Sequence, residues 1–148
     1  DRVTPLAHLG EIAAQAVGIA QGALEVAAAD ATERRQFGKP IAELQMIQAM
    51  LADSKTEAYA ARCMVIDVAR RRDAGENIVQ LCAAAKLFAS EMVGRVADRA
   101  VQVFGGSGYI ADYGIERFYR DVRIFRIYEG TSQVQQLVIA RNLLKSMG

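Results

Sequence analysis

The sequence is poor in the residues that build secreted, metal-binding and nucleic-acid-binding domains. Among its 148 residues there is no tryptophan, and there are only one histidine and two cysteines. Cys63 and Cys82 lie in apolar helical patterns without the C-x-x-C spacing of a zinc or redox site. We therefore expect two buried thiols in a reducing compartment, with neither a disulfide nor a metal.

Charge of neither sign is in excess, because 18 lysines and arginines oppose 17 aspartates and glutamates. The one basic cluster, Arg70–Arg72, is followed at once by Asp73, which is typical of cations near a helix C-terminus. No basic stripe is joined to aromatic stacking residues, so no nucleic-acid partner is predicted. No apolar run approaches the ~18 residues of a membrane helix and no signal peptide is visible, so we expect no membrane span.

Prolines are equally scarce, at positions 5 and 40 only, which leaves long stretches open to helices. Apolar residues recur at alternating steps of three and four over 9–26, 44–68 and 78–103, the pattern of amphipathic helices. Helices of ~27–34 residues are ~40–50 Å long and should lie side by side. Pro40 suits the first turn of the second helix, while Gly75 and Gly105 suit the ends of the second and third helices.

The last third of the chain has a different pattern. A glycine-rich loop, "GGSGYIADYG", precedes a short predicted helix, "IERFYRD". A further helix is predicted from about Ser132 to Lys145, with Ser132 and Gln135 forming a capping box. No stretch is convincing as a strand. The predicted fold is one all-α domain over residues 1–148, an antiparallel four-helix bundle (up-down-up-down) with an inserted short helix.

Three segments at predicted helix ends could carry chemistry: "ERRQFGKP" (33–40), "QVFGGSGY" (102–109) and "YEGTSQ" (128–133). Each has a structural explanation as a turn or a helix cap, and the glycine run follows no strand, so it is not a dinucleotide fingerprint. Glu129 is different, because it lies before the predicted cap, between Tyr128 and Gly130. In a dry site beside an aromatic ring, such a carboxylate would be a usable general base.

Together, the three segments resemble the acyl-CoA dehydrogenase family, whose C-terminal helical domain would cover nearly the whole chain. The segment "RIYEGTSQVQQLVIAR" is similar to the family's catalytic segment, and "ERRQFGKPIAELQ" to its flavin-contacting turn. The strongest match is to the family's second signature, which this chain carries as Gln102, Gly105, Gly106, Gly108, Tyr109, Asp112, Arg117 and Asp121.

The resemblance implies an FAD-dependent oxidoreductase of fatty acid β-oxidation and lipid metabolism, a flavoprotein that converts an acyl-CoA to a trans-2-enoyl-CoA. Glu129 would be the catalytic base that removes the α-proton, while a hydride leaves the β-carbon for the flavin. Its backbone N–H would stabilise enolate-like charge on the thioester carbonyl. Tyr128, Gly130 and Arg141 would contact the acyl-CoA substrate.

The same resemblance implies the residues that contact FAD. Arg34 would contact the pyrophosphate, and Phe37 would pack near the adenosine half. The other flavin-binding residues would be Gln45, Thr131 and Gln133, with Gln102, Gly105 and Gly106 reaching the FAD of a neighbouring subunit. A flavin site shared in this way implies a homodimer or homotetramer, and electron-transfer flavoprotein would accept the electrons.

Some features depart from the family pattern. Leu9 stands where many members have a CoA-contacting arginine, which leaves an atypical substrate open. His8 aligns near the position where some members carry the base and is not a carboxylate, so Glu129 is the better candidate. The family's N-terminal helical and middle β domains are missing, so we expect an incomplete fragment of an enzyme from the bacterial cytoplasm or the mitochondrial matrix.

Two alternatives stay open at this point. A related oxidase, of the acyl-CoA or nitroalkane type, would pass its electrons to oxygen, although we expect an aspartate as the base in nitroalkane chemistry. A four-helix oligomerisation module without catalysis would tolerate the loss of Glu129. Packing of a bundle alone, however, does not require the three segments that match the flavin site.

Overall fold

The computed structural model describes residues 6–147, with the side chains of residues 8–147. It is an all-α fold, as predicted, and the last helix has the predicted bounds. The α-helices are α1 (Leu6–Glu33), α2 (Gln45–Asp73), α3 (Val79–Phe104), α4 (Ile115–Val122) and α5 (Ser132–Lys145). Short 3₁₀ helices lie between them at Ile41–Glu43, Gly105–Tyr109, Ala111–Tyr113 and Arg123–Arg126.

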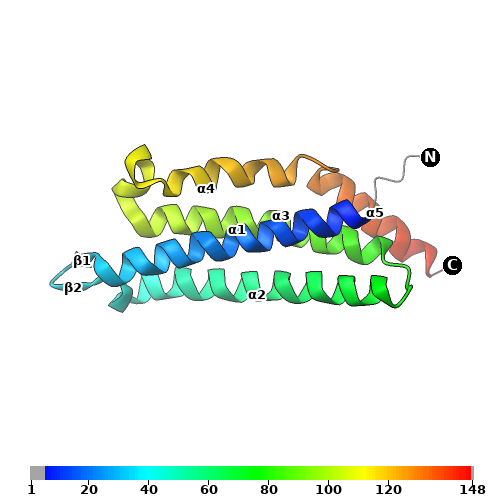
Figure 1. The fold of residues 1–148 in the computed structure, drawn as a ribbon, viewed down its shortest axis with the longest axis horizontal. Helices are drawn as coiled ribbons and strands as arrows, with labels where there is room; N and C mark the ends of the chain where they lie inside the picture. Colours follow the sequence, from blue (N-terminus) through cyan, green and yellow to red (C-terminus); the bar gives the residue numbers. More distant parts are fainter. Residues whose placement is uncertain (1–5, 148) are drawn as a thin grey trace.

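The three long helices lie side by side and alternate in direction, as Figure 1 shows. Helix α4 runs beside α1 and α3, opposite in direction to α3, and α5 continues in the same direction at the far end of the bundle. The fourth layer of the predicted up-down-up-down bundle is therefore built by α4 and α5 in succession. Both of these shorter helices pack on α3, which lies at the centre of the fold.

The core is built largely from alanine. Fully buried residues include Ala13, Ala16, Ala20 and Ala23 of α1 and Ala89 and Ala97 of α3. Short side chains at these contacts let neighbouring helices approach closely. Two residues predicted to be buried are not: Val26 is 40% exposed, because the buried stripe of α1 passes through Ala27 instead, and Cys63 is exposed on α2, whereas Cys82 is buried.

Helix α1 is unusually apolar for its length. By length and composition alone, its stretch His8–Glu33 would suffice to cross a membrane, with a mean hydropathy of 1.4. The sequence predicts no membrane span, because polar residues interrupt this stretch and leave no unbroken apolar run as long as a membrane helix. Core helices of helical bundles satisfy the same test, and the alanine face of α1 packs on α3.

A small hairpin joins α1 to α2, although no strand is predicted there. Strands β1 (Arg35–Gln36) and β2 (Lys39–Pro40) pair antiparallel, with Arg35 opposite Pro40. Phe37 and Gly38 form the loop with φ angles of 52° and 80°, the type I′ pattern that fits the twist of a hairpin. Two-residue strands are too short to give an alternating pattern. Pro40 accordingly ends the hairpin, and α2 begins only at Gln45, so the placement of Pro40 in that helix is wrong.

The two ends of the bundle carry the three conspicuous segments. The hairpin and the Gly105–Tyr109 turn lie together at the end where α1 and α3 finish (Figure 1). The segment from Tyr128 to Gln133 lies away from that end and connects the α4 layer to α5. The fold therefore separates the candidate residues into two groups before any of their contacts are considered.

Candidate functional site

Glu129 has an uncommon backbone conformation. Its φ angle is 52°, and within residues 6–147 only Phe37 is another non-glycine residue with positive φ. Gly130 follows with φ of 87°, so two consecutive left-handed residues turn the chain sharply into α5. A left-handed conformation costs a non-glycine residue about 1–2 kcal/mol, so the surrounding structure must hold Glu129 in place.

Two side chains from the helices hold this loop by its carbonyl groups. Lys86 of α3 is fully buried, and its Nζ donates to the carbonyl oxygens of Phe125 and Gly130, both at 2.8 Å. Nε2 of Gln135 of α5 donates to the carbonyl of Glu129 at 3.1 Å and to that of Gly130 at 3.3 Å. The backbone on both sides of the Glu129 side chain is therefore fixed from within the bundle.

The Glu129 carboxylate itself is exposed in this chain. The described residues alone therefore do not supply the dry surroundings in which a carboxylate would be a usable general base. The neighbouring Tyr128 turns its ring inward, edge-on to Phe125 with a centroid distance of 5.5 Å. Burial and the nearby Glu129 carboxylate both raise the pKa of Tyr128, which keeps its hydroxyl protonated. The Tyr128 ring thus anchors the loop against Phe125, while the neighbouring Glu129 side chain is exposed.

The start of α5 differs in detail from the predicted capping box. Thr131 is the N-cap, since its Oγ1 accepts a hydrogen bond from the N–H of Val134 at 3.3 Å. Ser132 Oγ donates instead to Glu91 Oε1 of α3 at 2.6 Å. The Ser132–Gln135 box is therefore wrong: the cap lies one residue earlier, and Gln135 serves the loop carbonyls. Gln133, the last residue of the predicted segment, is exposed.

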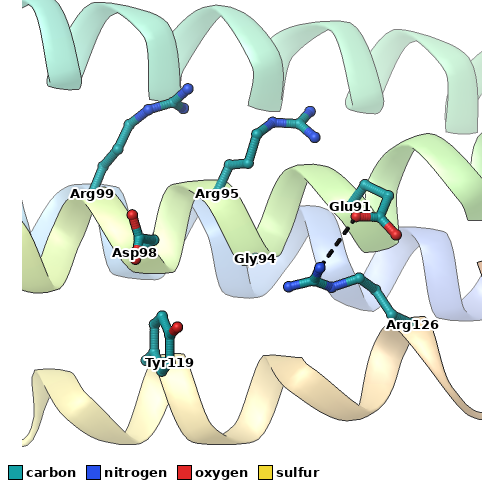
Figure 2. A pocket seen from close by; sticks show the side chains of 7 residues that line it. All are labelled: Glu91, Gly94, Arg95, Asp98, Arg99, Tyr119 and Arg126. Atoms are coloured by element: carbon teal, nitrogen blue, oxygen red, sulfur yellow. Dashed lines mark hydrogen bonds and ion pairs between the residues drawn. The ribbon is translucent and has the colours of Figure 1, made fainter.

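Glu91 continues this network into a charged cleft. Its Oε2 lies 3.4 Å from Nη1 of Arg126, on the 3₁₀ turn before the Glu129 loop. Figure 2 shows Arg126 reaching toward Glu91, while Arg95 and Arg99 point together toward α2. The cleft, of about 380 Å³, is lined by Glu91, Gly94, Arg95, Asp98, Arg99, Tyr119 and Arg126. None of the residues predicted for catalysis or flavin binding lines it.

The other end of the bundle brings the first two segments together. Nη1 of Arg34 donates to the carbonyl oxygen of Phe104, the last residue of α3. Gly105 follows with φ of 59°, and a Cβ there would lie 3.4 Å from Nη2 of Arg34, so glycine leaves room for the guanidinium. Phe37 is 88% exposed at the hairpin tip. Exposed residues at this end also include Gln45 at the start of α2, Gln102 near the end of α3, and Gly106 in the turn after it.

These two groups cannot meet within one copy of the chain. Gly105 lies 19 residues after Lys86 at the end of the same helix, which is roughly 28 Å at 1.5 Å per residue. The Glu129 loop, with Tyr128, Gly130 and Thr131, therefore stays at one end and Arg34 at the other. Arg141 is exposed in the later turns of α5, away from both groups along the chain.

Sequence reasoning missed Lys86, which makes the closest contacts to the loop. One signal could have found it: "AAAKLFAS" places a single lysine inside an otherwise apolar stretch of helix. Buried lysines are rare and are usually paired. Among the described residues, no group of three or more histidine, cysteine, aspartate or glutamate side chains could hold a metal ion.

Comparisons with known proteins agree on one family. The family model described as "Acyl-CoA dehydrogenase, C-terminal domain" matches residues 10–144. The chain is 52% identical over 134 residues to a probable acyl-CoA dehydrogenase of Bacillus subtilis, covering 90% of this chain and 35% of that protein. It is 49% identical, with the same coverage, to a subunit of the caffeyl-CoA reductase-Etf complex of Acetobacterium woodii.

A solved structure shows the same likeness in three dimensions. The butyryl-CoA dehydrogenase of Megasphaera elsdenii superposes with a TM-score of 0.90 at 43% identity, covering 92% of this chain and 36% of that one. The chain thus spans about a third of the length of the relatives it matches.

Proposed function

Because the chain belongs to the acyl-CoA dehydrogenase family, as its C-terminal helical domain, we propose that it supplies the catalytic base and part of the flavin site of an FAD-dependent acyl-CoA dehydrogenase. The reaction is the α,β-dehydrogenation of an acyl-CoA thioester to a trans-2-enoyl-CoA. One observation carries the proposal: Glu129 is held in a left-handed conformation by buried contacts on both of its sides. The remaining domains of the enzyme would cover the exposed carboxylate.

The residues at the hairpin end fit the phosphate and adenosine parts of FAD. The Arg34 guanidinium is fixed beside Gly105 by the carbonyl of Phe104, and arginine is well suited to contacting a pyrophosphate. The exposed ring of Phe37 offers a face for stacking. Because these residues lie far from the Glu129 loop, the separation supports a flavin site shared between two copies of the chain, and hence a homodimer or homotetramer.

The carboxylate and the backbone N–H of Glu129 would have separate roles in the reaction. The Glu129 carboxylate accepts the α-proton of the acyl-CoA. Within residues 6–147 the N–H of Glu129 has no hydrogen-bond acceptor, so it is free to donate to the thioester carbonyl as negative charge develops there. Thr131 and Gln133, which follow Glu129 in the chain, would contact the flavin, and Gly130 would contact the substrate. When bound, FAD supplies the acceptor for the hydride that leaves the β-carbon.

The same site serves the reverse reaction, and one comparison favours it as a second candidate. The relative from Acetobacterium woodii is named as part of a reductase complex. In that direction Glu129, protonated, would give its proton to the α-carbon of an enoyl-CoA. The name of that complex also supports an electron-transfer flavoprotein as the redox partner, in preference to oxygen as in an acyl-CoA oxidase.

An anaerobic titration of the flavin-loaded holoprotein tests the proposal. Acyl-CoAs of increasing chain length are added while the visible flavin band is followed, for the wild type and for Glu129→Gln. We expect one range of chain lengths to bleach the wild type, and the variant to retain its flavin and lose about 10²–10⁴-fold in bleaching rate. Equal bleaching of both proteins would show that the base lies elsewhere, and bleaching by no acyl-CoA would contradict the function itself.

A further inference from the structure

Resting on the function proposed above, we propose that Lys86 is a positioning residue for the catalytic base: it clamps the backbone on both sides of Glu129 and thereby sets where the carboxylate points. The side chain comes from α3, while the loop belongs to the chain between α4 and α5. Its two acceptors, the carbonyls of Phe125 and Gly130, lie before and after Glu129 in the sequence. One ammonium group therefore spans the whole turn that carries the base.

A buried lysine at this place calls for an explanation beyond packing. Burial lowers the pKa of Lys86, and the nearby carboxylates of Glu91 and Glu129 act in the opposite direction. Desolvation of an ammonium is costly, and an apolar side chain of similar volume would avoid it. An apolar side chain would not satisfy the carbonyl groups of Phe125 and Gly130, which both lie 2.8 Å from Nζ of Lys86. The charge is thus placed where backbone groups need a strong donor.

The network around Lys86 makes the clamp specific to this loop. Gln135 holds the carbonyls of Glu129 and Gly130 from α5, so Gly130 O accepts hydrogen bonds from both sides. A Cβ on Gly130 would lie 2.7 Å from Nε2 of Gln135, so a side chain there would displace the Gln135 amide from the loop carbonyls. The left-handed turn, the lysine and the glutamine therefore fit one arrangement of the loop. Loss of the lysine would leave the carbonyl of Phe125, on the N-terminal side of Glu129, without this donor, while Gln135 alone would hold the carbonyls of Glu129 and Gly130.

The test is a double-mutant cycle in the flavin-loaded holoprotein. Lys86→Met keeps the volume and removes the donor, and Lys55→Met, at an exposed lysine of α2, is the matched control. We expect Lys86→Met to slow flavin bleaching at saturating acyl-CoA by about tenfold to a hundredfold, with little change in the acyl-CoA concentration that gives half the maximal rate. Lys55→Met should match the wild type.

The second half of the cycle distinguishes positioning of Glu129 by Lys86 from a general loss of protein stability. In the Glu129→Gln background, Lys86→Met should slow bleaching far less than in the wild type, because the carboxylate that Lys86 positions is gone and only the backbone N–H of residue 129 is left to be misplaced. An equal slowing in both backgrounds would overturn the proposal and leave Lys86 with a structural role alone. If Lys86→Met fails to hold flavin, Lys86→Gln replaces it. Its amide is a neutral donor on a shorter side chain, so we expect an intermediate rate, and a wild-type rate for that variant would also overturn the proposal.

Amide hydrogen exchange keeps this test independent of the proposed activity. If no acyl-CoA bleaches the wild-type protein, the function fails, yet the clamp is still measurable. Lys86→Met should speed exchange in the peptide that contains Glu129 and Gly130 by about tenfold or more relative to Lys55→Met, because local opening no longer breaks the Lys86 hydrogen bonds. Unchanged exchange in that peptide would mean that Lys86 does not hold the loop.

Discussion

At the scale of single residues, two glycines of the "GGSG" motif, Gly106 and Gly108, have different structural roles. A Cβ on Gly108 would lie 2.4 Å from the carbonyl oxygen of Val101 and 3.0 Å from Cβ of Phe104, so this glycine is required for the turn to pack on α3. A Cβ on Gly106 would meet nothing within 4 Å. Two glycines of "GGSG" are thus distinguished by structure: Gly108 serves the fold, and Gly106 is free to serve a contact outside this chain.

This difference gives a prediction about stability. Gly108→Ala should lower the free energy of unfolding by about 1–3 kcal/mol, the usual cost of forcing atoms into a packed site. Gly106→Ala should change it by less than about 0.5 kcal/mol. Urea denaturation of the two variants measures both values. If Gly106 approaches a neighbour's FAD, Gly106→Ala should also lose flavin more readily in gel filtration. Equal losses of stability in the two variants would contradict the claim that only Gly108 is needed for packing.

At the scale of elements, the bundle is tied together by ion pairs as well as by alanine packing. Glu57 of α2 accepts hydrogen bonds from Arg95 at 2.6 Å and from Arg99 at 2.7 Å, both on α3. Burial alone would raise the pKa of Glu57, but the hydrogen bonds from Arg99 and Arg95 outweigh it and hold the pKa below its usual value. The α2–α3 contact therefore depends on an ionised carboxylate.

The pH dependence of this contact has a definite sign. A pKa lowered by folding gives stability that is present above the pKa of the unfolded chain, about 4.3, and is lost as pH falls through the lower folded value. Glu57→Gln should therefore be less stable than the wild type at neutral pH, with the gap closing between about pH 5 and pH 3. Thermal unfolding at several pH values measures this difference in stability between Glu57→Gln and the wild type, and Glu11→Gln, at an exposed position of α1, is the control. A gap that stays constant with pH would contradict this role.

The elements also show how far the sequence alone can reach. The long helices and the start of α5 follow from apolar periodicity and from turn residues such as Gly75, because these signals are local. The β1–β2 hairpin was missed because strands of two residues have no period. Lys86 was missed as a site residue because its partners, Phe125 and Gly130, are distant in sequence and meet it only in the folded bundle. Glu129 was predicted as a candidate base from its motif, whereas no signal in the sequence indicated its left-handed conformation.

At the scale of the whole molecule, the two groups of proposed site residues lie apart in one chain. Under the proposed function, the Glu129 loop would supply an exposed base, and the Arg34 end would supply flavin contacts without a base. The chain also spans only about a third of the length of its relatives. In the proposed assembly, the loop of one copy works with the other domains of its own subunit, while the hairpin end completes the flavin site of a neighbour. Catalysis is then a property of the assembly.

Deuterium incorporation tests most directly whether Glu129 removes the α-proton, the step on which the proposed function depends. The flavin-loaded holoprotein is incubated anaerobically in D₂O with the acyl-CoA that bleaches it and the matching enoyl-CoA, and the recovered acyl-CoA is analysed by mass spectrometry. We predict deuterium at the α-carbon with the wild type, and no more than the protein-free background with a Glu129→Gln variant that retains flavin. Equal incorporation by both proteins would contradict the assignment of Glu129 as the base.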